Sequence, residues 1–577
     1  MTFHYLKKLL LAACVLTADM AQAAESEIAI KGIDGALADN VRAFLSLYKE
    51  SCDTPKWRVQ KVFAQADQEI GMALRALGHY HPVVTKTLVF TENCWRADFD
   101  IKAGPPVIIR QAKLEVTGAA QNDPAFIKLL AAFPLKPGKT LNHGVYESLK
   151  QSLHSLSLER GYINAKFSRK LLRIDPETNS ANIELIYASG PRFYFGEVHI
   201  RQDILDPDFV RRYINIKPNE HYSSKKLAAI YNGLAASAYF KTLELQPRLA
   251  NIENLRIPLD IVLYPEKKHS YTLGVGFDTN YGPVFSAGHT NRRINRQGHS
   301  LVTTLNVSPV LSTVDSRYIV PLQNPVTDSF SLGLGYKHEE PDTFKSDQFK
   351  LSAQRQKISA DGWQKILFLD LTHEIYHSSD IDKSSTLLIP GHRWQKTQSN
   401  NQIRPTQGYL LSFSVAGAHK AIVSDASFVQ AGASAKWITP APGYGRFITR
   451  GDLGATLIDD FKNLPETYRY FAGGTQSIRG YDYKNLGPTD DKNEVIGGKM
   501  LTVFSLEYEK FIGEKWGVAA FVDSGNAYNL DQFSLRTGVG VGARWLSPVG
   551  PIRIDFAVPL NDSGSSFRIH FAAGAQL

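Results

Sequence analysis

The sequence predicts a protein of several domains: three α+β units with the element order β-α-α-β-β, followed by a 16-stranded antiparallel transmembrane β-barrel. Three observations lead to this prediction. A pattern of helices and strands repeats about every 80 residues in the N-terminal half. The C-terminal half alternates apolar residues with small or charged ones, which is the period of a strand. After the first two dozen residues, no apolar run approaches the ~18 residues of a transmembrane helix.

The composition narrows the class of protein. The 577 residues are 43% hydrophobic and 21% charged, which is too apolar for a disordered chain. The net charge of +9 is spread over a long chain, whereas nucleic-acid binding usually requires a concentrated basic face. We therefore expect no nucleic-acid partner. Few charges and 11% aromatic residues are compatible with a membrane barrel, whose strands each carry a weak signal.

The N-terminus has the pattern of an export signal. Lys7 and Lys8 precede the apolar run 9–16, and the segment 21–23 reads AQA. This order predicts a secretory signal peptide that is cleaved after Ala23. The alternative is a lipoprotein signal ending at Cys14, which would leave only five apolar residues after Lys8.

Cleavage after Ala23 leaves two cysteines, Cys52 and Cys94, in the exported chain. Two cysteines in an oxidising compartment suggest one disulfide. The alternative is a pair of buried free thiols.

The N-terminal half repeats its element order three times. In the first unit we expect a strand at 28–33, helices at 37–49 and 58–77, and strands at 83–90 and 96–101. The joint 103–107 recurs 86 residues later as 189–193. The second helix of each unit ends at Gly78, Gly161 or Ala238, with a tyrosine one or two residues later. Glycine at this position is typical of a left-handed helix cap.

These patterns predict the domain boundaries. Each unit of about 80 residues is long enough to have its own core. We expect a signal peptide at 1–23, repeated units at 24–104, 105–190 and 191–267, and the barrel at 268–577.

Sixteen strands are expected in the C-terminal half. Their starts lie near residues 270, 283, 298, 312, 327, 346, 363, 383, 407, 424, 442, 499, 515, 535, 549 and 566. This gives about 19 residues per strand with its share of loop, and a transmembrane strand needs about 9–11. Near the strand ends lie Trp363, Trp394, Trp437, Trp516 and Trp545, as in an interfacial aromatic girdle. One long connection, about 458–498, joins strands eleven and twelve.

The segment 373–377 reads HEIYH and fits the zinc-protease pattern H-E-x-x-H. That chemistry requires a helix, because the two histidines must reach one ion. The preceding run, 366–371, is strand-like, and four residues along a strand span about 13 Å. We therefore expect no metal site. The sequence also has no phosphate-binding loop and no G-x-S-x-G, so we expect no cofactor and no enzymatic activity.

Four motifs in the C-terminal half carry a family resemblance. They read FAGGTQSIRGY at 471–481, RPTQGY at 404–409, FVDSG at 521–525 and SPVGPIRID at 547–555. Together they resemble the outer-membrane assembly and translocation barrels, the superfamily that includes BamA, TamA and the two-partner secretion pores. The repeated units resemble the POTRA domains of that superfamily. Three such units and this chain length are similar to the TamA branch.

The resemblance implies a role for the segment 471–481. In such barrels the arginine of this loop folds into the lumen and pairs with inward acidic groups. Here the matching segment is Ile478, Arg479, Gly480 and Tyr481, with Glu507 or Asp523 as partner of the arginine. A planar guanidinium binds a carboxylate through two hydrogen bonds, which lysine cannot reproduce. We expect a latch that fixes the loop inside the barrel; the alternative is an exposed loop arginine.

The last strand has little side-chain packing. It contains Phe571, Ala572, Ala573, Gly574 and Ala575, and the chain ends in leucine where such barrels usually end in Phe or Trp. We expect this strand to pair weakly with the first strand and to form a lateral gate there. The alternative is a slightly frayed but permanently closed seam.

The resemblance further implies a function. We expect a protein of the bacterial outer membrane that helps to insert or secrete outer-membrane proteins of the autotransporter type. Its POTRA units would lie in the periplasm and bind a TamB-like protein anchored in the inner membrane. One alternative is a two-partner secretion pore for a dedicated exoprotein. Another is a structural link between the membranes that serves lipid transfer.

Overall fold

The computed structural model describes residues 27–92, 94–378, 381–401, 404–530, 533–548, 550–561 and 567–573. The expected signal peptide, with Cys14, lies outside the described residues. The chain forms two compact units, one consisting mainly of the residues through 198 and the other mainly of 260–577. Among the described residues, no helix has the length and apolarity needed to cross a membrane.

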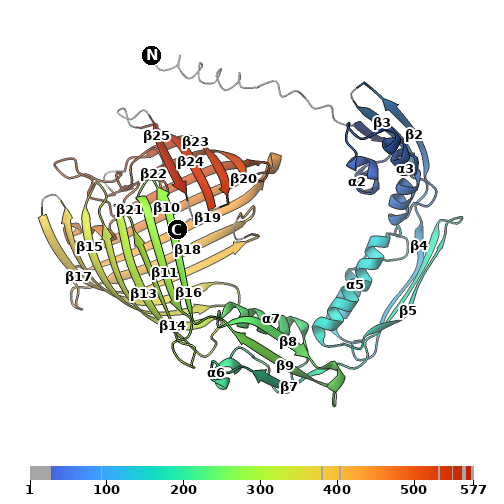
Figure 1. Cartoon of the computed structure of the whole chain (residues 1–577), viewed down its shortest axis with the longest axis horizontal. Helices are drawn as coiled ribbons and strands as arrows, with labels where there is room; N and C mark the ends of the chain where they lie inside the picture. The colour runs from blue at the N-terminus through green and yellow to red at the C-terminus, as the bar shows by residue number, and fades with distance from the viewer. Residues whose placement is uncertain are drawn as a thin grey trace. The chain divides into compact units, whose positions relative to one another are not determined.

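The first small sheet is built in the predicted order (Figure 1). Its elements are β1 (Glu27–Lys31), α2 (Gly35–Phe44), α3 (Lys56–Ala76), β2 (Val83–Phe90) and β3 (Trp95–Lys102). The strand order is β1-β3-β2, with β1 parallel and β2 antiparallel to the central strand. Val41, Ile70 and Phe99 lie in its apolar core. A disulfide joins Cys52 to Cys94.

The helix predicted over 37–49 is interrupted. α2 ends at Phe44, and a short 3-10 helix follows at Ser46–Lys49. The cause is a contact distant in sequence: the backbone N–H of Ser46 donates to Glu69 Oε2 at 2.9 Å and its hydroxyl donates to Oε1 at 2.6 Å. These two hydrogen bonds tie Ser46 to Glu69 of α3. The periodicity of the segment itself gives no sign of such a contact.

The second sheet repeats this arrangement. It consists of β4 (Ile108–Thr117), α4 (Pro124–Ala132), α5 (His143–Arg160), β5 (Lys166–Asp175) and β6 (Ser180–Ala188), in strand order β4-β6-β5. Asp123 caps α4 by accepting a hydrogen bond from the Ala125 N–H at 3.0 Å. α5 ends at Gly161, whose φ of 85° lies in the left-handed region predicted for it.

The third sheet has the order β7-β9-β8. Its elements are β7 (Tyr194–Arg201), α6 (Pro207–Arg211), α7 (Ser224–Ala236), β8 (Phe240–Pro247) and β9 (Arg256–Pro265). Ala238 follows α7 with a φ of 59°, at the position where the first two units place Gly78 and Gly161. The next residue, Tyr239, is buried. The helix ends of the three units thus share one backbone conformation.

Sixteen antiparallel strands form one closed barrel, coloured green through red in Figure 1. They are β10 (His269–Asp278), β11 (Gly282–Asn291), β12 (Ser300–Val307), β13 (Leu311–Pro321), β14 (Asp328–Glu339), β15 (Lys345–Ile358), β16 (Gln364–Ser378), β17 (Ile381–Ser399), β18 (Gly408–Ala418), β19 (Phe428–Ala441), β20 (Gly445–Ile458), β21 (Met500–Ile512), β22 (Trp516–Tyr528), β23 (Arg536–Ser547), β24 (Gly550–Pro559) and β25 (Arg568–Ala573). The predicted number of strands and the long connection between the eleventh and twelfth are confirmed.

The two faces of the barrel differ in chemistry. On β10, Tyr271, Leu273 and Val275 point outward and are 73%, 79% and 82% exposed. The opposite face lines the lumen and carries carboxylates, arginines and glycines. The predicted girdle tryptophans lie near the barrel end at which β10 begins: Trp363, Trp394, Trp437, Trp516 and Trp545. An apolar outside and an aromatic edge are what a lipid bilayer requires of a barrel.

A candidate functional site in the barrel lumen

The long connection between β20 and β21 folds against the inner wall of the barrel. It contains 3-10 turns at Phe461–Asn463 and Glu466–Tyr468, followed by the segment 471–481. Ile478 is fully buried and Arg479 is 3% exposed. Ile478 and Tyr481 pack with Val503 of β21 in a small apolar cluster. The structure therefore places this arginine inside the barrel.

Arg479 binds three carboxylates from three strands. Its Nε and Nη2 donate to the two oxygens of Asp523 on β22, at 2.7 and 3.0 Å. Its Nη1 donates to Glu507 on β21 at 2.7 Å and to Asp555 on β24 at 3.2 Å. The backbone N–H of Arg479 also donates to Asp523, at 3.1 Å. Both carboxylates that the sequence named as alternatives are partners, and Asp555 is a third that it did not name.

The planar shape of the guanidinium matters in this site. Its central carbon lies 3.3 Å from the ring centroid of Phe521, which also belongs to β22. The flat cation therefore stacks on an aromatic face while its edge binds Asp523 in the two-bond geometry. The arginine side chain is 4% exposed and that of Asp523 is 0% exposed. Because both charges have left water, removing one would leave the other buried without its counter-charge.

A second arginine completes the cluster. Arg544 on β23 donates to Glu507 at 2.7 Å and to Asp555 at 2.6 Å. It therefore bridges two of the carboxylates that bind Arg479. Arg544 is a functional residue that the sequence patterns did not indicate; the signal available for it was its lumen-facing position on β23, the strand before the SPVGPIRID motif.

Glycines on β23 make room for the connection. Gly538, Gly540 and Gly542 all face the lumen, on the same side of the strand as Arg544. A Cβ atom on Gly538 would lie 1.9 Å from the backbone oxygen of Arg479. A Cβ on Gly540 would lie 2.4 Å from the Phe521 ring. The loop backbone can approach this strand because no side chain stands in the way.

The connection also contacts both sides of the barrel seam. The Gly480 N–H donates to Nε2 of His570 on β25 at 2.8 Å. Asp482 forms an ion pair with Arg568 of the same strand. On the other side, Thr475 exchanges two hydrogen bonds with Asn280, directly after β10, at 2.7 and 3.0 Å.

The described part of the seam is short. Phe277 and Asp278 of β10 pair with Ala573 and Ala572 of β25, whereas all six described residues of β25 pair with β24. Beyond the ladder, the Thr279 N–H donates to the Phe571 carbonyl at 3.0 Å. The predicted gate residues Gly574 and Ala575 lie outside the described residues.

The HEIYH segment lies on strand β16, as predicted. His373 and His377 are exposed, and they contact Thr386 and Asp382 on the next strand. Glu374 points to the lumen, where it accepts hydrogen bonds from Ser346 and Gln348. Within the described ranges, no group of three or more His, Cys, Asp or Glu side chains is placed to hold a metal ion.

Comparisons with known proteins agree with this architecture. A model of the Omp85 superfamily domain matches residues 270–576, and a model of the first POTRA domain of TamA matches residues 27–103. The chain is 24% identical to the outer membrane protein assembly factor BamA of Nitratidesulfovibrio vulgaris, in an alignment of 404 residues that covers 63% of this chain. It is 22% identical over 78% of its length to BamA of Neisseria meningitidis serogroup B.

The coverage of these relatives is partial. The chain spans 49% of the length of the first relative and 64% of the second. Among solved structures, it is similar to BamA from Haemophilus ducreyi lacking POTRA domains 1–3, with a TM-score of 0.64 and 18% identity, covering 81% of this chain and 99% of that one. This last likeness concerns the fold.

The family model covers more than half of the chain, and the closed barrel, the preceding small sheets and the lumenal arginine all agree with it. The chain belongs to the Omp85 superfamily and is an outer-membrane β-barrel protein with POTRA units in the periplasm.

Proposed function

We propose that this protein inserts or secretes outer-membrane proteins of the autotransporter type by opening the seam between β10 and β25. The observation that carries the proposal is the position of the connection between β20 and β21. Thr475 of this connection is hydrogen-bonded to Asn280, whereas Gly480 and Asp482 bind His570 and Arg568. The conformation of this connection is therefore coupled to whether the two strands of the seam are together.

The seam offers a template for a client strand. If β10 and β25 separate, each presents unpaired backbone N–H and C=O groups. A strand of an unfolded client can then add to that edge by backbone hydrogen bonding. In the described part of the seam, Phe277 and Asp278 pair with Ala573 and Ala572, and these are backbone hydrogen bonds that a client strand would replace.

Arg479 has the role of a latch in this proposal. Its carboxylate partners lie on β21, β22 and β24, which precede the seam on the β25 side. The Thr475–Asn280 bonds lie on the β10 side. Opening the seam breaks the Thr475–Asn280 hydrogen bonds, while the Arg479 ion pairs keep the connection in the lumen. The motif can therefore bind Asn280 again when the barrel closes.

The small sheets supply the docking surface for a partner. In the first sheet, β1 and β2 are edge strands around the central β3, and in the second sheet β4 and β5 flank β6. An edge strand can accept a strand from another protein. We propose that a TamB-like protein anchored in the inner membrane binds the periplasmic units in this way; the match of residues 27–103 to the first TamA POTRA domain supports this choice of partner.

A reconstitution experiment tests the function. The full-length protein is placed in liposomes, an autotransporter barrel is added from urea, and its folding is followed by the electrophoretic shift between unheated and heated samples. We expect faster folding than in liposomes without the protein, and no acceleration by Arg479→Ala protein. An equal folding rate with and without the wild-type protein would contradict the proposal. Steady ion conductance without folding of the client would favour a secretion pore.

A further inference from the structure

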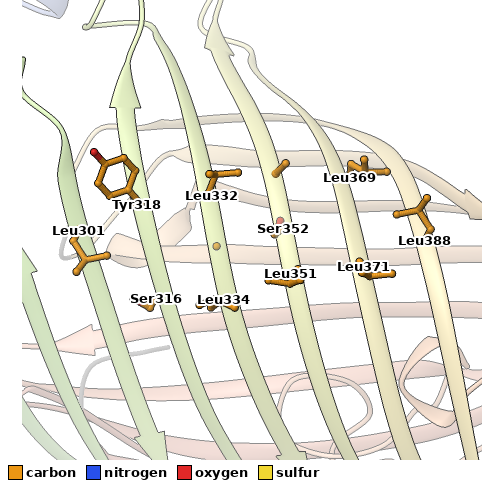
Figure 2. Close-up of a pocket in the computed structure, with 12 residues that line it drawn as sticks. Leu301, Ser316, Tyr318, Leu332, Leu334, Leu351, Ser352, Leu369, Leu371 and Leu388 are labelled. Atoms are coloured by element: carbon orange, nitrogen blue, oxygen red, sulfur yellow. The ribbon is translucent and has the colours of Figure 1, made fainter. Parts of the chain in front are cut away.

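The outer wall of the barrel has an apolar hollow on strands β12 to β17. Its volume is about 480 Å³. Figure 2 shows leucines of neighbouring strands around it. The lining residues are Leu301, Ser316, Tyr318, Leu332, Gly333, Leu334, Leu351, Ser352, Ala353, Leu369, Leu371 and Leu388.

The hollow faces the membrane and not the lumen. Leu351 lies on the same face of the sheet as its register partners Leu334 and Leu371, and all three side chains are at least 36% exposed. On the other side of β15, Gln348 donates to Thr467 of the connection inside the barrel at 3.0 Å. Because side chains alternate along a strand, Leu351 points outward.

Small outward side chains create the hollow. Ala353 stands between Leu332 and Leu369 in one cross-strand row. In the next row, Ser316 pairs with Leu334. A small residue among leucines leaves a depression that another apolar chain can fill.

A basic edge lies on the same face, toward the periplasm. Arg355 follows Ala353 by two residues on β15, and Lys357 follows by four, a distance of about 13 Å along the strand. Lys365 of β16 is the direct cross-strand partner of Lys357. All three side chains are exposed.

Positive charge exceeds negative charge at this edge. Asp328 is the cross-strand partner of Lys357 on β14, but it forms its ion pair with Arg355, at 2.9 Å. Among the described residues, neither Lys357 nor Lys365 forms an ion pair. Like charges directly opposite each other on a sheet are destabilising. An anion located between them would remove that repulsion.

We propose that the hollow and its basic edge bind one anionic phospholipid of the periplasmic leaflet. An acyl chain lies along Ala353 between the leucines, and the phosphate lies between Lys357 and Lys365. Charge complementarity selects the ligand, because basic clusters at a membrane surface favour anionic headgroups. Ala353 lies about 13 Å along the strand from Lys357. This separation allows an acyl chain to extend from a headgroup at the lysines into the hollow.

Native mass spectrometry of the full-length protein tests the proposal. The protein is equilibrated in micelles with equal amounts of phosphatidylglycerol and phosphatidylethanolamine, and the retained lipids are counted. We expect one phosphatidylglycerol to be retained preferentially. Lys357→Gln/Lys365→Gln should weaken this retention about fivefold for each lysine removed. Ala353→Phe should also reduce it, because the ring fills the hollow.

Matched controls separate this site from general lipid contact. Lys510→Gln/Lys515→Gln removes two lysines from the same end of the barrel, one on β21 and one in the turn before β22, and Ala520→Phe enlarges an outward alanine on β22. Both should leave retention unchanged. Equal loss in the control and test variants, or equal retention of both lipids by the wild type, would overturn the proposal. Each variant is first checked for folding by its electrophoretic shift on heating, and Lys365→Gln alone replaces a variant that fails.

Discussion

The second POTRA unit and the barrel lumen are stabilised by different kinds of buried contact. The second unit buries apolar side chains, among them Leu149, Leu185 and Tyr187, each at most 1% exposed. The lumen buries charges, with Arg479 and Asp523 at 4% and 0% side-chain exposure. Apolar contacts are non-directional and tolerate small shifts. A buried ion pair requires each partner in place, so the lumen depends on a few specific residues.

The comparison predicts the largest effect at Arg479. Arg479→Ala leaves Asp523 buried without its counter-charge and should cost about 3–5 kcal/mol of barrel stability. The measurement is thermal loss of the compact form in unheated electrophoresis. Arg317→Ala, which changes a half-exposed lumenal arginine paired with Asp315, is the control and should have little effect. If the two variants melt alike, the buried cluster does not hold the barrel.

A cavity in the second unit should have a comparable but local effect. Leu149 is fully buried on α5, and Leu149→Ala should destabilise its unit by about 2–5 kcal/mol. Hydrogen exchange of the full-length protein should show faster exchange in β4–β6 and unchanged exchange in the barrel strands. Faster exchange in both regions would show that the second unit and the barrel unfold as one cooperative unit, which would contradict their separate stabilisation.

The lumenal glycines sharpen the comparison further. In Gly538→Ala the new methyl group meets the Arg479 backbone oxygen, so the connection must shift, at a cost of about 1–3 kcal/mol. Limited proteolysis should then cut within 459–499 faster than in the wild type. Gly451→Ala is the matched control, because a Cβ there meets nothing within 4 Å. Equal cleavage of both variants would show that the connection does not rest on β23.

The smallest effect is a dependence on pH in the second unit. Burial raises the pKa of Asp123, but hydrogen bonds from Arg160 and the Ala125 N–H lower it by more, to below its ordinary value of 3.8. The stabilisation is therefore present above pH 3.8 and is lost as the pH falls through the lower pKa of the folded state. Asp123→Asn should flatten the acid side of the stability curve, measured by exchange in α4. Glu147→Gln, at an exposed carboxylate, should not.

Sequence predicted what depends on local periodicity. The β-α-α-β-β order and the sixteen strands follow from alternation and spacing, and the lumenal parity of Glu507 follows from the same alternation. The resemblance of the motif directed attention to Arg479. Each of these features depends on residues within a single element or a single motif.

The rest depends on which strands become neighbours across the lumen. Arg544 and Asp555 join the Arg479 cluster because β23 and β24 follow β22 in the wall of the closed barrel. Gly538 is needed because the connection after β20 packs against β23 at this position. The alternation of residues along β23 does not indicate that need. The broken helix at Leu45 has the same kind of cause, since Glu69 holds Ser46 from another helix. Contacts distant in sequence were the ones missed.

The most direct test of the proposed function is a reversible disulfide across the seam. Phe277→Cys/Ala573→Cys joins cross-strand partners of β10 and β25, and Leu273→Cys/Ala287→Cys makes the same change between β10 and β11. Client folding is measured in liposomes before and after reduction. We expect the seam disulfide to stop folding and reduction to restore it, with no change in the control. Full activity while the seam is oxidised would contradict the gate.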